Sequence, residues 1–198
     1  MMKHPEQRVG VFVDVQNMYY SAKNIYNSKV NFGEILKTAV AGRKLIRAIA
    51  YVIKAEAPDE QSFFDALSKQ GFEVRSKDLQ VFYGGQKKGD WDVGVAVDAI
   101  RLASRLDVVV IVSGDGDFIP LVEYLKFYGQ QVEVVAFARS ASTRLTEVVD
   151  DFTDLCLDES KYLLRNHRGP FNLKRLVKPI QNVGRSRPAN QPTPKTKS

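Results

Sequence analysis

Carboxylate side chains follow two apolar runs of this sequence and open a helical pattern in a third segment. These residues are Asp14, Asp92, Asp115 and Asp117. The clearest case is "VVVIVSGDGDF" (108–118), where five apolar residues lead into two aspartates separated by one glycine. Carboxylate oxygens that gather at one place bind hard divalent cations such as Mg²⁺ or Mn²⁺. A metal site is therefore one interpretation of these aspartates.

Each aspartate also has a purely structural interpretation. Asp117 could cap the helix expected after it, and Asp115 could serve in a turn. Asp14 could cap a helix that starts near Asn17. Together, however, these roles would leave several negative charges at one edge of the fold, where like charges oppose ionisation. A bound divalent cation would remove that penalty, which favours the metal-binding interpretation.

The elements that must position these side chains follow from hydrophobic patterning. Four nearly continuous apolar segments predict strands covered on both faces: 8–15, 44–54, 107–114 and 131–137. Weaker patterns predict strands within 72–83 and 152–158. Helical patterns lie between the strands, at 17–26, 31–42, 58–71, 90–106 and 117–129. In the second of these, Asn31 is expected as the cap and Gly42 as the stop. Strands that alternate with helices predict an α/β domain with a mostly parallel sheet.

In such a sheet, functional residues gather beyond the carboxyl ends of the strands, near the point where the strand order reverses. If strands 8–15 and 107–114 are neighbours there, their three aspartates face one crevice. Asp90 is expected to cap the following helix, which puts Asp92 in its first turn, where a helix favours negative charge. Asp98 lies on another face of that helix, so we expect it to support the site or to bond within the core.

The remaining composition restricts the chemistry. One cysteine, Cys156, and two distant histidines, His4 and His167, argue against a zinc site or a histidine relay. No glycine-rich nucleotide-binding motif is present. Metal held by carboxylates is most useful at a phosphate, so hydrolysis of phosphodiesters fits best. Lys87 and Lys88, just before the Asp92 helix, are candidates to hold the substrate backbone.

Three further polar residues are candidates for roles at the same site. Asn17 could orient a metal-bound water or cap its own helix. Ser113 could donate a hydrogen bond to a carboxylate or phosphate, or serve only in a turn. Arg144, beyond the strand at 131–137, is a weaker candidate for contact with a phosphate.

Charge divides the chain into two parts. Residues 165–198 carry nine Lys or Arg and no acidic residue, together with five of the eight prolines, whereas residues 1–164 carry 20 basic and 23 acidic residues. We therefore expect a domain at 1–164 and a largely disordered basic tail at 165–198. The tail could contact phosphates or only aid solubility. No apolar run is long enough for a membrane span, and no signal peptide is apparent, which predicts a cytoplasmic protein.

At this point three segments are recognisable. "VFVDVQN", "KKGDWDVGVAVDA" and "IVSGDGDF" resemble, in order, the three motifs of the NYN domain, a PIN-like nuclease family, and in particular its LabA-like bacterial branch. The resemblance covers about residues 8–158. It implies a PIN-like three-layer α/β/α fold that binds Mg²⁺ or Mn²⁺ and cleaves RNA. It implies an acidic site with neighbouring and supporting positions, which are Asp14, Asp92, Asp115, Asp117, Asn17, Ser113 and Asp98.

The expected function is therefore a metal-dependent ribonuclease, with RNA and a divalent metal as partners and no membrane. RNA contacts are expected from Lys87, Lys88 and Arg144. A homodimer is also considered. The alternative is a catalytically weak module that binds RNA or regulates on the same fold. Four acidic positions favour the enzyme, because a pure binder of phosphate gains nothing from carboxylates.

Overall fold

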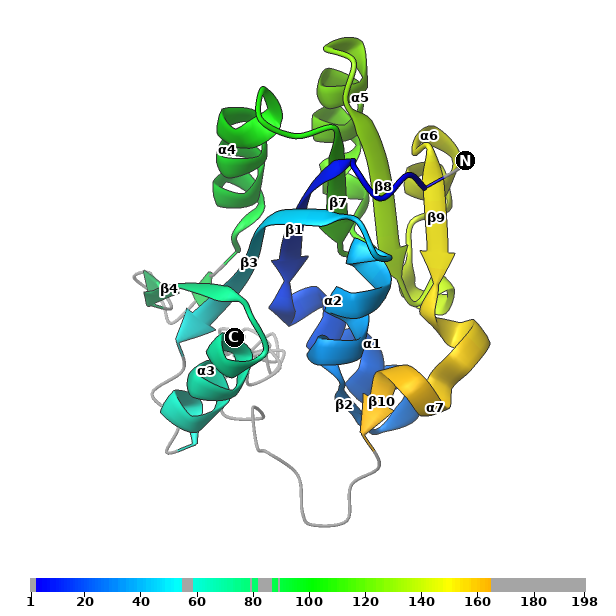
Figure 1. The fold of residues 1–198 in the computed structure, drawn as a ribbon. Coiled ribbons are helices and arrows are strands. Elements are labelled where there is room, and N and C mark those ends of the chain that lie inside the picture. Colours follow the sequence, from blue (N-terminus) through cyan, green and yellow to red (C-terminus); the bar gives the residue numbers. More distant parts are fainter. Residues whose placement is uncertain (1–2, 55–58, 79, 82–86, 89, 165–198) are drawn as a thin grey trace, which may run out of the picture.

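A six-stranded parallel sheet forms the centre of the structure (Figure 1). The computed structural model describes residues 3–54, 59–78, 80–81, 87–88 and 90–164. In spatial order the strands of the sheet are β4 (Glu73–Asp78), β3 (Lys44–Lys54), β1 (Arg8–Asp14), β7 (Val108–Val112), β8 (Gln131–Ala136) and β9 (Asp151–Asp154). Each neighbouring pair in the sheet is parallel. The predicted α/β architecture is confirmed.

Helices cover both faces of this sheet and make it the middle of three layers. One face carries α1 (Val15–Tyr26), α2 (Phe32–Val40) and α3 (Glu60–Lys69), and the other carries α4 (Asp92–Ala103), α5 (Ile119–Phe127) and α6 (Thr143–Val148). Alternation along the strands divides the core accordingly. Val11 and Val13 of β1 pack in the first cluster, whereas Phe12 packs in the second. Strands buried on both faces must be apolar throughout, which explains their near-continuous hydrophobicity.

The strand order reverses its direction once along the chain, and the place where it does so is the switch point of the sheet. From β1 the chain proceeds to β3 and then β4 at one edge, and it returns through α4 to β7, on the other side of β1. Connections between parallel strands are right-handed, so helices on the two sides of the switch lie on opposite faces. The carboxyl ends of β1 and β7 therefore lie at this switch point between the two helical layers, a region called the crevice from here on.

Several short elements escaped the sequence pattern. Two antiparallel ribbons pair β2 (Lys29–Val30) with β10 (Leu163–Leu164), and β5 (Gln80–Val81) with β6 (Lys87–Lys88). Helical turns were also missed, namely η2 (Ala138–Ser140), η3 (Leu155–Asp158) and α7 (Glu159–Tyr162). Elements of two to four residues are too short to show a hydrophobic period.

Some predicted boundaries were confirmed and others were wrong. The Asn31 side chain caps α2 by accepting from the Glu34 amide, as expected. That helix ends at Val40, the C-cap Ala41 takes the left-handed conformation, and Gly42, the predicted stop, follows it with a positive φ of 75°. The strand predicted at 152–158 ends at Asp154, whose carboxylate accepts from the Cys156 amide and starts the turn η3.

A buried ion pair joins the layers at the amino ends of the strands. The Arg43 guanidinium donates to both carboxylate oxygens of Glu133, at 2.7 and 2.9 Å, and also to backbone carbonyls of α2. Both side chains are almost fully buried. Separately, none of the helices in the described ranges is long and apolar enough to cross a membrane. The predicted basic tail, 165–198, lies outside these ranges.

Candidate functional site

The predicted neighbourhood of β1 and β7 is confirmed. Val13 pairs with Val112 in the parallel register, so Asp14 and the loop that follows Val112 leave the sheet side by side. Asp14 ends β1, and Asp115 and Asp117 follow β7 by three and five residues. The sheet therefore brings these three carboxylates to its carboxyl edge at the switch point.

Asp14 has both a structural role and an unfavourable electrostatic position. One carboxylate oxygen accepts from the Asn17 amide at 3.0 Å and caps α1. The other accepts from the Ser113 hydroxyl at 3.4 Å. Part of the residue is exposed, but protein atoms surround the carboxyl group. This burial, together with the negative charges of Asp92 and Asp115, raises the pKa of Asp14 to about 6.

The loop after β7 is held by hydrogen bonds rather than by packing alone. The buried Ser113 hydroxyl accepts from the Asp115 amide at 3.2 Å, and the Asn17 side chain accepts from the Gly114 amide at 3.0 Å. Of the roles considered for Ser113, the structure shows the hydrogen bond to a carboxylate, that of Asp14. Asn17 instead ties the first turn of α1 to the β7 loop, a role that the sequence did not indicate.

Gly114 is required by a close approach from the next layer. A Cβ atom there would lie 2.8 Å from the Ala141 Cα, and the Gly114 carbonyl accepts from the Ser142 amide at 2.8 Å. Only a residue without a side chain fits this contact. The segment before α6 therefore supports the loop that carries Asp115.

The capping roles predicted in this loop were wrong in one detail. The side chain of Asp115, not that of Asp117, accepts a capping hydrogen bond, from the Asp117 amide at 3.0 Å. This starts the 3₁₀ turn η1 (Gly116–Phe118), which leads into α5. Asp117 is exposed and adds negative charge near the crevice without a capping bond of its own.

Asp92 reaches the same crevice from the opposite helical layer. It is the first residue of α4, and its pKa is raised by burial and by the charges of Asp90, Asp115 and Asp117. The predicted cap at Asp90 was wrong, because Trp91 occupies the cap position and no side chain caps this helix. The field of a helix start still favours a carboxylate at Asp92.

Trp91 fixes the start of α4 against the sheet. Its indole nitrogen donates to the Val52 carbonyl at 2.8 Å, and its ring packs against Tyr51 with the centroids 5.2 Å apart. Gly94 makes room for it, since a Cβ there would lie 2.4 Å from a ring carbon of Trp91. The indole thus holds the backbone of Asp92 in place.

Asp98 lies away from this site, in the core between α4 and the sheet. Its carboxylate accepts from the Tyr51 hydroxyl at 2.9 Å and pairs with Arg75 at 2.5 Å. Of the two roles expected for Asp98, the structure places it in bonding within the core. It supports the site only by fixing α4 on β3 and β4.

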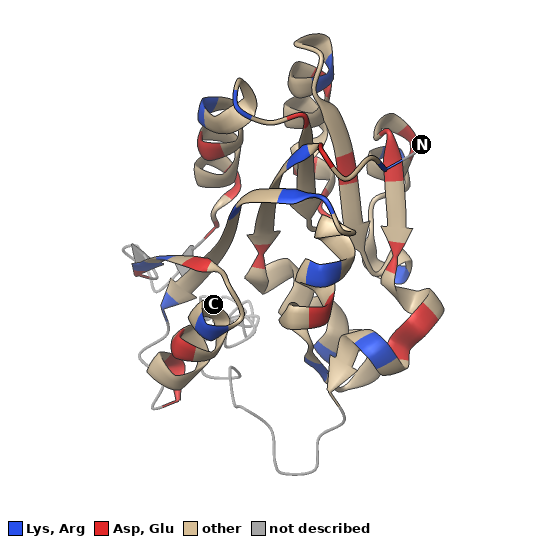
Figure 2. Ribbon diagram, in the orientation of Figure 1, with Lys and Arg blue, Asp and Glu red and all other residues tan. Residues whose placement is uncertain are grey.

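Cations around the crevice come partly from positions that the sequence did not single out. Lys77 of β4 lies 4.9 Å from the Trp91 ring centroid, and its charge opposes the rise in the Asp92 pKa. Two basic positions of this edge strand lie between acidic positions at its two ends (Figure 2). The weak strand pattern at 72–83 was the available signal for Lys77. Arg144 is exposed on α6, two residues after the Ser142 contact with the β7 loop. Lys87 and Lys88 lie on β6, and their side chains are outside the described part of the structure.

The donor chemistry of the site fits a hard cation, but its geometry is open. Within the described ranges, no three His, Cys, Asp or Glu side chains are grouped closely enough to hold a metal ion as they stand. Mg²⁺ keeps several of its waters and needs only one or two direct carboxylate ligands. Burial, and to a lesser extent the charges of neighbouring carboxylates, raises the pKa values of Asp14 and Asp92. Such a pair suits a hydrated divalent ion placed between them.

Comparison with known proteins places the chain in a family. A model of the NYN domain matches residues 8–158. The chain is 26% identical to the low amplitude and bright protein LabA of Synechococcus elongatus over 163 residues, which is 75% of this chain and 83% of that protein. It is 28% identical to an uncharacterized protein of Methanocaldococcus jannaschii over 152 residues, covering 73% of this chain but 54%, about half, of that relative.

A solved structure has the same fold. The crystal structure of a protein of unknown function from Vibrio parahaemolyticus superposes with a TM-score of 0.74 at 34% identity, covering 83% of this chain and all of that one. The three predicted motifs all lie within the matched region, and the fold agrees over most of the described structure. The chain belongs to the NYN domain family.

Proposed function

We propose that the protein is a metal-dependent ribonuclease that hydrolyses RNA phosphodiesters at the crevice between β1, β7 and α4. The observation that carries this proposal is the convergence of carboxylates from three elements. Asp14 comes from the sheet and Asp92 from a helical layer, and the pKa of each is raised, first by burial and then by neighbouring carboxylates that include Asp115. A fold gains no stability from such crowding, so a ligand that needs negative charge is the best explanation.

The proposed ligands are Asp14, Asp92, Asp115 and Asp117. Mg²⁺ or Mn²⁺ bound there would activate a water and neutralise charge on the phosphate. Through the hydrogen bonds described above, Ser113 and Asn17 fix the position of Asp14, at the end of β1, relative to the loop after β7 that carries Asp115. These two residues therefore position ligands and need not touch the substrate.

RNA contacts are proposed on both sides of the metal. Lys77 and Trp91 form one side, where a cation lies beside an aromatic ring that is anchored to the backbone of β3. Such pairs bind single-stranded nucleic acid by phosphate contact and base stacking. Arg144 forms the other side, and Lys87 and Lys88 precede the Asp92 helix. This arrangement suits a strand that crosses the crevice from β4 towards α6.

A degradation assay tests the proposal. Purified protein is incubated with labelled single-stranded and hairpin RNA in Mg²⁺, Mn²⁺ or EDTA, beside Asp115→Asn. Asp65→Asn is the matched control, since Asp65 is an exposed acid on α3 that accepts a hydrogen bond from Gln61 of the same helix. We expect cleavage by the wild type and Asp65→Asn in metal, and none in EDTA or with Asp115→Asn. Cleavage by Asp115→Asn at the wild-type rate would contradict the proposal.

The second candidate is an RNA-binding or regulatory module that cleaves weakly. The open arrangement of the carboxylates favours it, because in the described ranges no set of three is ready to hold a metal. It predicts that the protein binds RNA, with or without divalent metal, and that no metal produces cleavage. Binding measured on the same RNA by fluorescence anisotropy separates the two candidates.

A further inference from the structure

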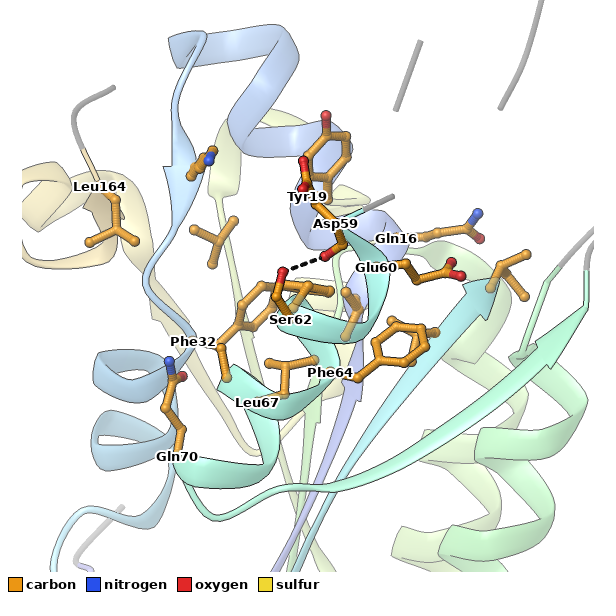
Figure 3. Close-up of a pocket in the computed structure, with 17 residues that line it drawn as sticks. Gln16, Tyr19, Phe32, Asp59, Glu60, Ser62, Phe64, Leu67, Gln70 and Leu164 are labelled. Atoms are coloured by element: carbon orange, nitrogen blue, oxygen red, sulfur yellow. Dashed lines mark hydrogen bonds between the residues drawn. The ribbon is translucent and has the colours of Figure 1, made fainter. Parts of the chain in front are cut away.

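A second hollow lies next to the acidic crevice and has a different chemistry. It measures about 400 Å³ and is bordered by α1, α3, the carboxyl end of β3 and the β2–β10 ribbon (Figure 3). Its walls are mainly apolar, with Phe32, Phe64 and Leu67 facing Leu164 across the space. Val15 and Gln16, which also line it, directly follow Asp14 in the chain. The pocket thus shares a border with the proposed active site but contains none of its ligands.

The rim of this pocket carries negative charge on one side. Asp59 and Glu60 begin α3 and lie at its edge, where Figure 3 shows both side chains. Lys29 adds one positive charge on the β2 side. An apolar hollow with acidic residues at its rim suits a segment in which apolar and basic side chains alternate. It suits RNA poorly, because carboxylates at the rim repel phosphates.

The chain itself contains such a segment. Residues 171–180, "FNLKRLVKPI", hold five apolar side chains interleaved with three basic ones. They lie beyond Leu164, which is in the pocket wall and ends β10. The six residues between Leu164 and Phe171 can span about 20 Å or more when extended, which is enough to cross the pocket. Tethering at this short distance gives an effective concentration on the order of millimolar.

We propose that residues 171–180 bind in this pocket of their own chain. Their apolar side chains occupy the space between α3 and Leu164, and their basic side chains pair with the acidic rim at the start of α3. Residues 165–198 lie outside the described part of the structure; the apolar pocket, its acidic rim and the sequence of the segment together favour this contact. The proposal needs no nuclease activity, and its test needs no RNA.

Limited trypsin digestion of the full chain tests this, because the tail provides its own reference sites. Lys174 and Arg175 lie inside the segment, whereas Arg185 lies beyond it. We expect cleavage at 174 and 175 to be at least about fivefold slower than at 185, since proteolysis follows the fraction of time the segment is released. Mass spectrometry of the fragments gives the rates. Equal rates at the three sites would overturn the proposal.

Variants on both sides of the contact complete the test. Ala66→Arg puts a charge into the pocket wall, and Ile180→Asp puts one into the segment, away from the bonds that trypsin cleaves. Each should remove the slow cleavage. Ser68→Arg, exposed on α3 outside the pocket, is the matched control and should preserve it. Ile180→Asp cannot unfold the described domain, because it lies outside it.

The same digestion shows whether the segment binds at another place or comes from a second copy of the chain. Protection that survives Ala66→Arg would mean that the segment binds elsewhere. Protection that disappears on tenfold dilution would mean that a second copy supplies the segment, which contradicts binding within one chain. Protection independent of protein concentration and lost in both variants supports the proposal.

Discussion

Replacing Asp14 by asparagine should stabilise the metal-free protein at neutral pH. The pKa of Asp14 is raised from 3.8 to about 6 by burial and by the neighbouring carboxylates. A group with a raised carboxyl pKa keeps its proton longer in the folded state than in the unfolded state. The free energy of unfolding therefore falls as pH rises from about 4 to about 6, and this loss is complete above pH 6. The shift of about two units corresponds to at most about 3 kcal/mol.

Asparagine removes this penalty and keeps the local structure. Its side-chain oxygen can still cap α1 by accepting from the Asn17 amide, because asparagine is a favourable capping residue. Urea unfolding in EDTA, followed by the fluorescence of Trp91, the single tryptophan, measures the effect. The difference in unfolding free energy between Asp14→Asn and the wild type should grow between pH 4 and pH 6.5 and then stay constant. Cleavage of RNA should be lost in the same variant.

Asp107→Asn is the matched control, because the pKa of Asp107 is shifted in the opposite direction from that of Asp14. Hydrogen bonds from Arg8 lower the pKa of Asp107 to about 2. The stability that it adds is present above pH 4 and is lost only as pH falls through 2, so this variant should be slightly less stable by a constant amount from pH 5 to 8. If the difference between Asp14→Asn and the wild type were equally constant over this range, the carboxyl of Asp14 would not be perturbed, and the reasoning would fail.

Three further predictions concern the surroundings of the site. Lys77→Gln should raise the KM for RNA about fivefold with little change in kcat, as expected for one lost phosphate contact of about 1 kcal/mol; steady-state kinetics checks this. Gly94→Ala should destabilise the protein by about 1–3 kcal/mol and shift the emission of Trp91, because the new methyl group would lie 2.4 Å from the indole. Arg43→Met should cost up to about 3–5 kcal/mol in urea unfolding, since the buried Glu133 loses its two hydrogen bonds from Arg43 and is left with Lys3, 3.5 Å away, and the Gln131 amide. The double variant with Glu133→Leu should recover much of that loss, and no recovery would argue against the buried charge as the cause.

The sheet was predictable because most of its strands have a clear hydrophobic pattern in the sequence. β1, β3, β7 and β8 are buried on both faces, and only unbroken apolar segments satisfy that environment. β4 was harder to place, since it lies at the edge of the sheet, has no fully buried residue and carries a charge at four of its six positions. The β2–β10 ribbon pairs residues more than 130 positions apart through two residues each. Pairing of that kind depends on the tertiary fold and leaves no local pattern.

The acidic positions of the site were predictable from strand ends, but their partners were not. Asp14 and Asp115 come at the ends of apolar strands. Because the strands are parallel, both residues were expected at the carboxyl edge of the sheet. The hydrogen bond from the Gly114 amide to Asn17 crosses between two loops and depends on how α1 leaves β1. The capping bond in the β7 loop came from Asp115 because a 3₁₀ turn precedes α5, and sequence propensity does not distinguish that turn from a first helical turn.

Asp92 and Asp98 show how one helix can separate a functional charge from a structural one. Six residues place them on different faces of α4, and the two environments differ in what balances the charge. Asp98 is buried deeply, yet Arg75 and the Tyr51 hydroxyl satisfy its carboxylate. Asp92 is less buried, yet its nearest strong influences besides burial are other carboxylates. A charge compensated within the protein serves the fold, whereas a charge left opposed by its neighbours is available to a ligand. A bound cation would therefore stabilise the protein most at the crevice. The difference in unfolding free energy between Asp14→Asn and the wild type measures how much the unbalanced charge of Asp14 destabilises the metal-free protein.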